Sequence, residues 1–130
     1  MNAEKFAGFS EVEPWISSPE NYKQINVEFE EKDSDSILNF YRQLVKFRKE
    51  NKIVQDGDIK FIERENNNVV AYVRTLGEKE LIVICNFKGE ETSLQEKNLS
   101  DYLTDYKKIL GNYDGVEKNL RPYETVVFEK

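Results

Sequence analysis

The stretch that decides the fold is Leu81-Ile82-Val83-Ile84-Cys85-Asn86-Phe87. It places five apolar residues in a row, Leu81 to Cys85, between Lys79-Glu80 and Lys88-Gly89. A short apolar run rich in β-branched residues and bounded by turn formers is typical of a strand covered on both faces. The run is also too short for an ordinary helix, in which β-branched side chains lose rotamer freedom. The sequence therefore predicts the central strand of an antiparallel sheet here.

Further short strands are predicted around this run. Asn66-Asn67-Asn68 and Leu76-Gly77-Glu78 have the composition of tight turns. The strands expected between such turns are residues 58–62, 69–75, 92–94, 107–110 and 125–128. Several short strands joined by turns, with no helix between them, indicate an antiparallel β-sandwich. The predicted fold class is mainly β, with one helix before the sheet.

That helix is predicted over residues 34–51. Asp33, Ser34 or Asp35 can each cap its first turn by accepting a backbone amide hydrogen. Asn51 is the expected C-terminal cap. The residues that repeat at about 3.6 positions and form one apolar face are Ile37, Phe40, Tyr41, Leu44 and Val45.

Residues 1–33 carry many apolar side chains but no clear periodicity. A long irregular segment of this kind is unusual inside a self-contained domain. We expect its rings to pack on a surface outside these 130 residues. The chain is accordingly divided into residues 1–51, the aromatic segment with the helix, and residues 52–130, the β-domain.

Composition excludes several classes of partner. The 130 residues carry a formal net charge of −6, and no cluster of Lys and Arg stands out. Such a surface does not favour nucleic acid or an anionic membrane. No run of residues has the length and apolar character of a membrane span. Cys85 is the single cysteine, so no internal disulfide is possible, which fits a reducing cytoplasm.

Residue types limit the chemistry further. The chain contains no histidine, which removes Ser-His-Asp and Cys-His catalysis and any His-ligated metal. Cys85 sits in the most apolar strand and is interpreted as a core residue, not a nucleophile. The acidic pairs around Ser34 and Gly57 lack the remaining ligands of a calcium loop and are read as cap and turn residues. No catalytic, cofactor-binding or metal residue is assigned.

Two interpretations remain open for the N-terminal aromatic residues. Trp15 and Tyr22 have rings that could stack on a sugar. Packing against a neighbouring domain is the alternative, and it applies to Phe9 as well. Phe9, Trp15 and Tyr22 are therefore the candidate residues for packing on a barrel or for stacking on a sugar.

The order of motifs resembles the α-amylase family of glycoside hydrolases, in its oligo-1,6-glucosidase, dextran glucosidase and trehalose-6-phosphate hydrolase branch. The segments that carry the resemblance are Phe6-Ala7-Gly8-Phe9-Ser10, Pro14-Trp15-Ile16, Asn21-Tyr22-Lys23-Gln24-Ile25-Asn26-Val27, residues 35–44, residues 81–87 and Leu120-Arg121-Pro122-Tyr123-Glu124. The resemblance implies that residues 1–51 are the last loop and helix of a catalytic barrel. It implies that the β-domain is that family's C-terminal domain. The family's catalytic acids lie upstream of every segment matched here, so none is carried over.

The resemblance predicts a non-catalytic C-terminal part of an α-glucosidase-type enzyme, which braces the catalytic barrel of the same parent chain. The alternative is a free-standing carbohydrate-binding or protein-interaction module, with Trp15, Tyr22, Tyr72 and Tyr123 as candidate stacking groups. A small hydrolase using two of the 25 acids is a third hypothesis. We also expect an exposed apolar face that favours self-association, and no cofactor.

Overall fold

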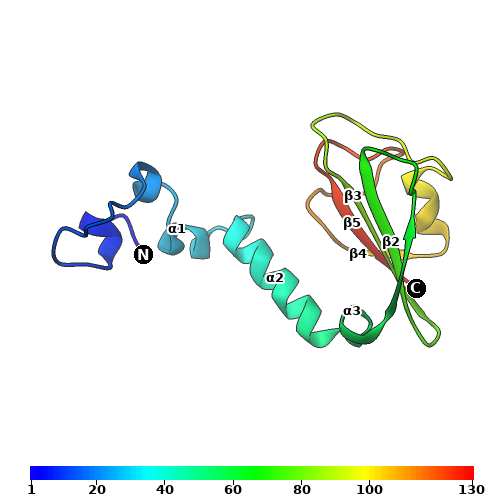
Figure 1. The fold of residues 1–130 in the computed structure, drawn as a ribbon, viewed down its shortest axis with the longest axis horizontal. Helices are drawn as coiled ribbons and strands as arrows, with labels where there is room; N and C mark the ends of the chain where they lie inside the picture. Colours follow the sequence, from blue (N-terminus) through cyan, green and yellow to red (C-terminus); the bar gives the residue numbers. More distant parts are fainter. The chain divides into compact units, whose positions relative to one another are not determined.

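The computed structural model describes all 130 residues, which form two compact units, Met1–Glu50 and Asn51–Lys130 (Figure 1). The first unit contains the 3₁₀ turns η1 (Lys5–Gly8) and η2 (Glu20–Lys23) and the helices α1 (Val27–Lys32) and α2 (Ile37–Glu50). The second contains α3 (Lys52–Asp56), η3 (Leu99–Thr104) and five strands. The strands are β1 (Asp58–Ile62), β2 (Val69–Leu76), β3 (Lys79–Asn86), β4 (Lys107–Gly111) and β5 (Thr125–Glu129).

The five strands form one antiparallel sheet in the order β1-β2-β3-β5-β4. The predicted central strand is confirmed, because β3 pairs with β2 on one side and with β5 on the other. Ile84 lies opposite Ala71 of β2 and Val126 of β5. The antiparallel, β-rich class predicted from the sequence is confirmed as well.

One face of the sheet carries the core of this unit. Ile84, Val126 and Phe128 are fully buried on it. Leu99 and Tyr102 of η3 cover these side chains, and the Tyr102 ring stacks on Phe128 at 5.5 Å between centroids. Burial of apolar area contributes about 25 cal/mol per Å², so this contact stabilises the unit.

The layer above the core differs from the second sheet of a sandwich. It consists of η3 and two loops, which meet in a single antiparallel bridge between Thr92 and Leu120. Residues 92–94, predicted as a strand, form only that bridge. Thr92 and Leu120 exchange both backbone hydrogen bonds. The strand pairing does not extend further, because neighbouring backbone groups form hydrogen bonds elsewhere. Gln95, for instance, donates its amide to the side chain of Glu63.

The opposite face of the sheet is covered only at one end. There α3 packs on β2 and β3, with Ile53 and Leu81 buried. Arg74 fixes this helix by donating to the carbonyl oxygens of Ile53 (2.9 Å) and Gly57 (2.6 Å). Along β1 and the start of β2, this face leaves apolar side chains in solvent: Ile59 is 50% exposed, Phe61 55% and Val70 45%. We call these three residues the open sheet face.

Two features of the first unit differ from the sequence prediction. Residues 1–33 were expected to be irregular, but Val27–Lys32 is a helix, capped by Asn26, whose Oδ1 accepts the amide of Phe29. Six residues are too few to show a helical period. The cap of α2 is Ser36 and none of the three predicted residues, because the Ser36 hydroxyl accepts from Asn39 and donates to the Glu30 carbonyl.

At the other end of α2, Asn51 is not a left-handed C-terminal cap. Its backbone is extended (φ −109°, ψ 105°), and it serves as the residue before α3. The helical period of residues 34–51 does not reveal the break between α2 and α3, because Lys52–Asp56 continues with residues that also favour a helix. The apolar stripe of α2 is also more open than a core-facing helix would be, with Ile37 84% and Tyr41 65% exposed.

A hydrogen bond between Tyr106 and Glu80 ties the segment after η3 to the start of β3, and we expect it to make stability pH-dependent. The Tyr106 hydroxyl donates to Glu80 Oε2 at 2.6 Å, and this bond, with burial, raises the pKa of Tyr106 to about 12 from 10.0. A raised folded-state pKa gives stability that is complete below pH 10 and is lost between about pH 10 and 12. We therefore expect the free energy of unfolding, measured by urea denaturation, to fall less steeply between pH 10 and 12 in Tyr106→Phe than in the wild type.

Tyr102 also contributes to the alkaline loss of stability, since its pKa is raised to about 12, chiefly by burial. Because Tyr102 remains in both proteins, the difference between their pH profiles reports on Tyr106. Tyr41→Phe, at an exposed position, serves as the control and should keep the wild-type pH profile. Identical alkaline slopes for wild type and Tyr106→Phe would contradict the assignment.

Candidate functional site

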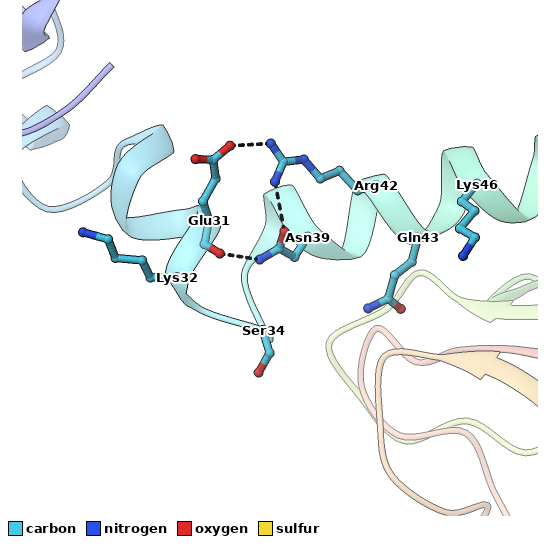
Figure 2. A pocket seen from close by; sticks show the side chains of 7 residues that line it. All are labelled: Glu31, Lys32, Ser34, Asn39, Arg42, Gln43 and Lys46. Atoms are coloured by element: carbon cyan, nitrogen blue, oxygen red, sulfur yellow. Dashed lines mark hydrogen bonds and ion pairs between the residues drawn. The ribbon is translucent and has the colours of Figure 1, made fainter.

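The corner between α1 and α2 is the first candidate site, because polar side chains surround a shallow pocket there. The pocket has a volume of about 480 Å³ (Figure 2). Its lining residues are Glu31, Lys32, Ser34, Asn39, Arg42, Gln43 and Lys46.

Most of the polar atoms at this corner are already used by the protein itself. Arg42 donates to Glu31 Oε1 at 2.6 Å and to Asn39 Oδ1 at 3.3 Å. The Asn39 amide in turn donates to the backbone carbonyls of Glu30 and Asp33. Figure 2 shows Lys32 directed away from Arg42, so the cations of the pocket do not converge on one point. These hydrogen bonds connect helix α2 to helix α1 and to the residues that follow it.

The three aromatic residues singled out from the sequence lie in this same unit. Trp15 is 95% exposed and Phe9 is 56% exposed. Tyr22 is partly buried, and its backbone carbonyl oxygen accepts a hydrogen bond from the side-chain amide of Asn26. No ring–ring contact joins any two of them. Their roles in packing or sugar stacking stay predictions.

The remaining chemical candidates are accounted for by local structure. Cys85 is partly buried in β3, and its Sγ accepts the hydroxyl hydrogen of Thr125 at 3.1 Å. Asp33 accepts the backbone amide of Asp35, as a turn residue does. No group of three or more Cys, Asp and Glu side chains is arranged to hold a metal ion. None of the helices is long and apolar enough to cross a bilayer.

A second polar cluster lies in the β-domain at the turn that leads into β5. Glu124 is 1% exposed and receives three hydrogen bonds from Arg121: from its backbone amide (2.8 Å), from Nε (3.1 Å) and from a terminal nitrogen (2.7 Å). Hydrogen bonding to Glu124 raises the pKa of Arg121 above its ordinary value. The guanidinium also lies over the ring of Tyr113, at 4.3 Å from the centroid.

Asn86 completes this cluster from the end of β3. It is 1% exposed, and its amide donates to the carbonyls of Glu90 and Arg121, while its Oδ1 accepts the amide of Lys88. Tyr123, held in the turn between Arg121 and Glu124, has a positive φ of 54° and is 64% exposed. The cluster fixes the path of the chain between the end of β3 and the start of β5.

Sequence reasoning missed a similar buried carboxylate, Glu63. Its side chain is 4% exposed in total and accepts the amides of Gln95 and Glu96 and the Asn66 side chain. Its backbone adopts a positive φ of 53°. The sequence gives no local signal for this burial, because the two backbone donors, Gln95 and Glu96, lie more than thirty positions away. The polar clusters of the β-domain thus hold the loops around its core.

Each of the two units contains a segment that matches the model of a known protein family. Residues 1–57 match the family model described as alpha amylase, catalytic domain, and residues 69–127 match that of the alpha-amylase SusG C-terminal domain. The chain thus combines a segment that matches an amylase catalytic domain with one that matches an amylase C-terminal domain. It belongs to the α-amylase family, as the sequence motifs predicted.

Individual relatives agree with this assignment. The chain is 41% identical to an oligo-1,6-glucosidase of Bacillus cereus over 128 residues, which are 95% of this chain and 23% of the relative. It is 33% identical to the trehalose-6-phosphate hydrolase of Bacillus subtilis, covering 98% of this chain and 24% of that protein. The crystal structure of the trehalose-6-phosphate hydrolase of Bacillus licheniformis, R201Q variant, superposes with a TM-score of 0.86 at 35% identity, covering 98% and 24% of the two chains. The chain therefore spans about a quarter of the length of these relatives.

The ion pair of Arg121 and Glu124 gives a direct test of the second polar cluster. Glu124→Gln presents an amide NH₂ to Arg121 donors, and breaking a buried pair costs about 3–5 kcal/mol. We expect a loss of that size in the free energy of unfolding, measured in urea. The matched control is Glu117→Gln, since Glu117 also pairs with Arg121, at 3.4 Å, but its side chain is 61% exposed. That variant should change stability by about 0–1 kcal/mol, and equal losses in the two variants would contradict the assignment.

Proposed function

We propose that the chain is the non-catalytic C-terminal part of an α-glucosidase-type enzyme that hydrolyses α-glucosidic bonds in oligosaccharides. In this proposal residues 1–51 belong to the catalytic barrel of the same parent chain, and residues 52–130 brace it. Support comes from the relatives, which are oligo-1,6-glucosidases and trehalose-6-phosphate hydrolases about four times as long as the region matched. A cytoplasmic location is part of the proposal and rests on the single cysteine.

The observation that carries the bracing role is the open sheet face. Ile59, Phe61 and Val70 lie on the side of the sheet opposite the core, and about half of each side chain is exposed. Tyr72 packs edge-on against Phe61 there, at 6.0 Å between ring centroids. A contiguous apolar surface of this kind marks an interaction site. A barrel wall would remove it from water, while self-association through the same face stays a prediction.

The test is a chimera in which these 130 residues replace the matching quarter of the Bacillus cereus oligo-1,6-glucosidase. Phe61→Glu places a charge in the proposed interface, so we expect it to lower the melting temperature of the chimera by several degrees and to shorten its activity half-life on heating. The matched control is Leu103→Glu, at an apolar residue that is 47% exposed on η3, on the covered side of the sheet.

The same two substitutions in the isolated 130-residue chain separate bracing from local stability. There, Leu103→Glu should change the free energy of unfolding by about 0.5 kcal/mol or less. Phe61→Glu should lower it by about 0.5–1.5 kcal/mol, because the ring contact with Tyr72 is lost. Equal effects of Phe61→Glu and Leu103→Glu in the chimera would contradict the bracing role. Turnover of an oligosaccharide by the isolated chain would contradict its non-catalytic character.

A carbohydrate-binding module is the second candidate function, and the exposure of Trp15 favours it. A ring that is 95% exposed, preceded by Pro14, is available to stack on the apolar face of a sugar. Trp15 is the only tryptophan of the chain, so its fluorescence reports this contact directly. Isomaltose titration should then give a saturable change in the emission.

The control for this titration is Tyr123→Ala, which removes another exposed ring of the chain and leaves the fluorophore in place. It should keep the emission change if Trp15 is the binding group. An emission spectrum unaltered up to the solubility limit of the sugar would remove this second candidate and leave bracing as the function.

A further inference from the structure

We propose that Asp114-Gly115 is a site of spontaneous isoaspartate formation, while the same dipeptide at Asp56-Gly57 is protected by the fold. The sequence contains Asp-Gly at only these two places. Glycine lacks a side chain that would shield its amide nitrogen, so this dipeptide is the most prone of all Asp-Xaa pairs to the reaction. The inference is independent of the proposed function.

The reaction closes a five-membered ring within the chain. The amide nitrogen of Gly115 attacks the side-chain carboxyl carbon of Asp114, forming a C–N bond and expelling the carboxyl hydroxyl with the amide proton as water. Hydrolysis of this succinimide at one carbonyl restores aspartate, and at the other it routes the main chain through the side chain. Water lost in the first step is regained in the second, so the mass of the chain is unchanged.

The surroundings of Asp114 leave the reacting groups accessible. Asp114 and Gly115 are exposed, in the loop that follows β4. Gly115 has φ +66°, and no atom beyond its own residue and its two chain neighbours lies within 4 Å of the position that a Cβ would occupy there. The Asp114 carboxylate takes part in none of the hydrogen bonds or ion pairs that hold the loop, which run through backbone carbonyls. The nucleophile and the carboxyl carbon are therefore both open to attack and to water.

Arg121 adds an electronic effect at the same place. Two of its nitrogens donate to the Asp114 carbonyl oxygen, each at 3.1 Å, and Lys108 donates to the Gly115 carbonyl at 2.7 Å. The Asp114 carbonyl belongs to the peptide group whose nitrogen is that of Gly115. Charge-assisted donors on this oxygen draw electron density from the amide and stabilise its deprotonated, nucleophilic form.

The second dipeptide lies in a contrasting environment. The Gly57 amide donates to the Ile53 carbonyl as the last bond of α3, at 3.2 Å, so this nitrogen is engaged. A Cβ on Gly57 would approach the Ile53 oxygen to 2.5 Å, which shows how closely the backbone is packed. Arg74 further holds the Gly57 carbonyl at 2.6 Å. Succinimide formation here requires α3 to unwind first.

The test is to store the purified 130-residue chain at mildly acidic pH and body temperature for several weeks. Peptide mapping and enzymatic methylation with a labelled methyl donor then quantify isoaspartate at each site. We expect the Asp114 peptide to accumulate isoaspartate at least about ten times faster than the Asp56 peptide. Asp114→Glu should abolish the signal, because the longer side chain closes a six-membered ring slowly, while Asp56→Glu should leave it unchanged.

A parallel sample unfolded in urea separates the effect of the fold from that of the sequence. There the two dipeptides should react at similar rates, because both are followed by glycine. Equal rates in the folded chain, faster reaction at Asp56, or a signal that survives Asp114→Glu would each overturn the proposal. Asp114→Asn supplies the positive control, since loss of ammonia from asparagine yields the same succinimide.

Discussion

The structure of the β-domain depends on the burial of Ile82 and Ile84 on β3. These side chains lie on one face of the central strand of the five-stranded sheet. Their burial requires β2 and β5 to align Ala71, Val126 and Phe128 beside them, and it requires η3 to close the layer above. Because side chains alternate along a strand, a shift of one residue would move this whole set to the other face. The register of three strands therefore follows from two residues.

The loops around this core are held by buried polar groups. Glu124 and Glu63 each collect donors from the backbone and from side chains, and Asn86 connects the end of β3 to the turn at Arg121. A buried carboxylate is costly to desolvate unless its oxygens are satisfied, and here no buried side-chain nitrogen or oxygen lacks a partner. These residues look like catalytic candidates by type and burial. Their contacts hold the loops around the core in place.

The first unit is organised in a different way. Its helices are joined by a polar corner at Ser36 and Asn39, and its one buried apolar residue is Ala7. Large apolar side chains such as Trp15 and Ile37 remain in solvent. The sequence had indicated this excess of exposed apolar side chains, because residues 1–33 carry many aromatic rings without a periodicity that could bury them. The match of residues 1–57 to a catalytic domain supports the proposal that these side chains pack on a barrel.

The sequence by itself determined the central strand, four of its companions, the antiparallel class, the main helix and the family. These follow from local signals, since apolar runs, alternation, turn residues and consecutive motifs are all read within a few positions. The tertiary structure alone decided that Ser36 caps α2, that Val27–Lys32 is helical, and that Glu63, Asn86 and Glu124 are buried. It also decided which sheet face is left open. The contacts responsible join residues as far apart as Asn86 and Arg121, and no local pattern of residue types encodes which distant donor a polar side chain will meet.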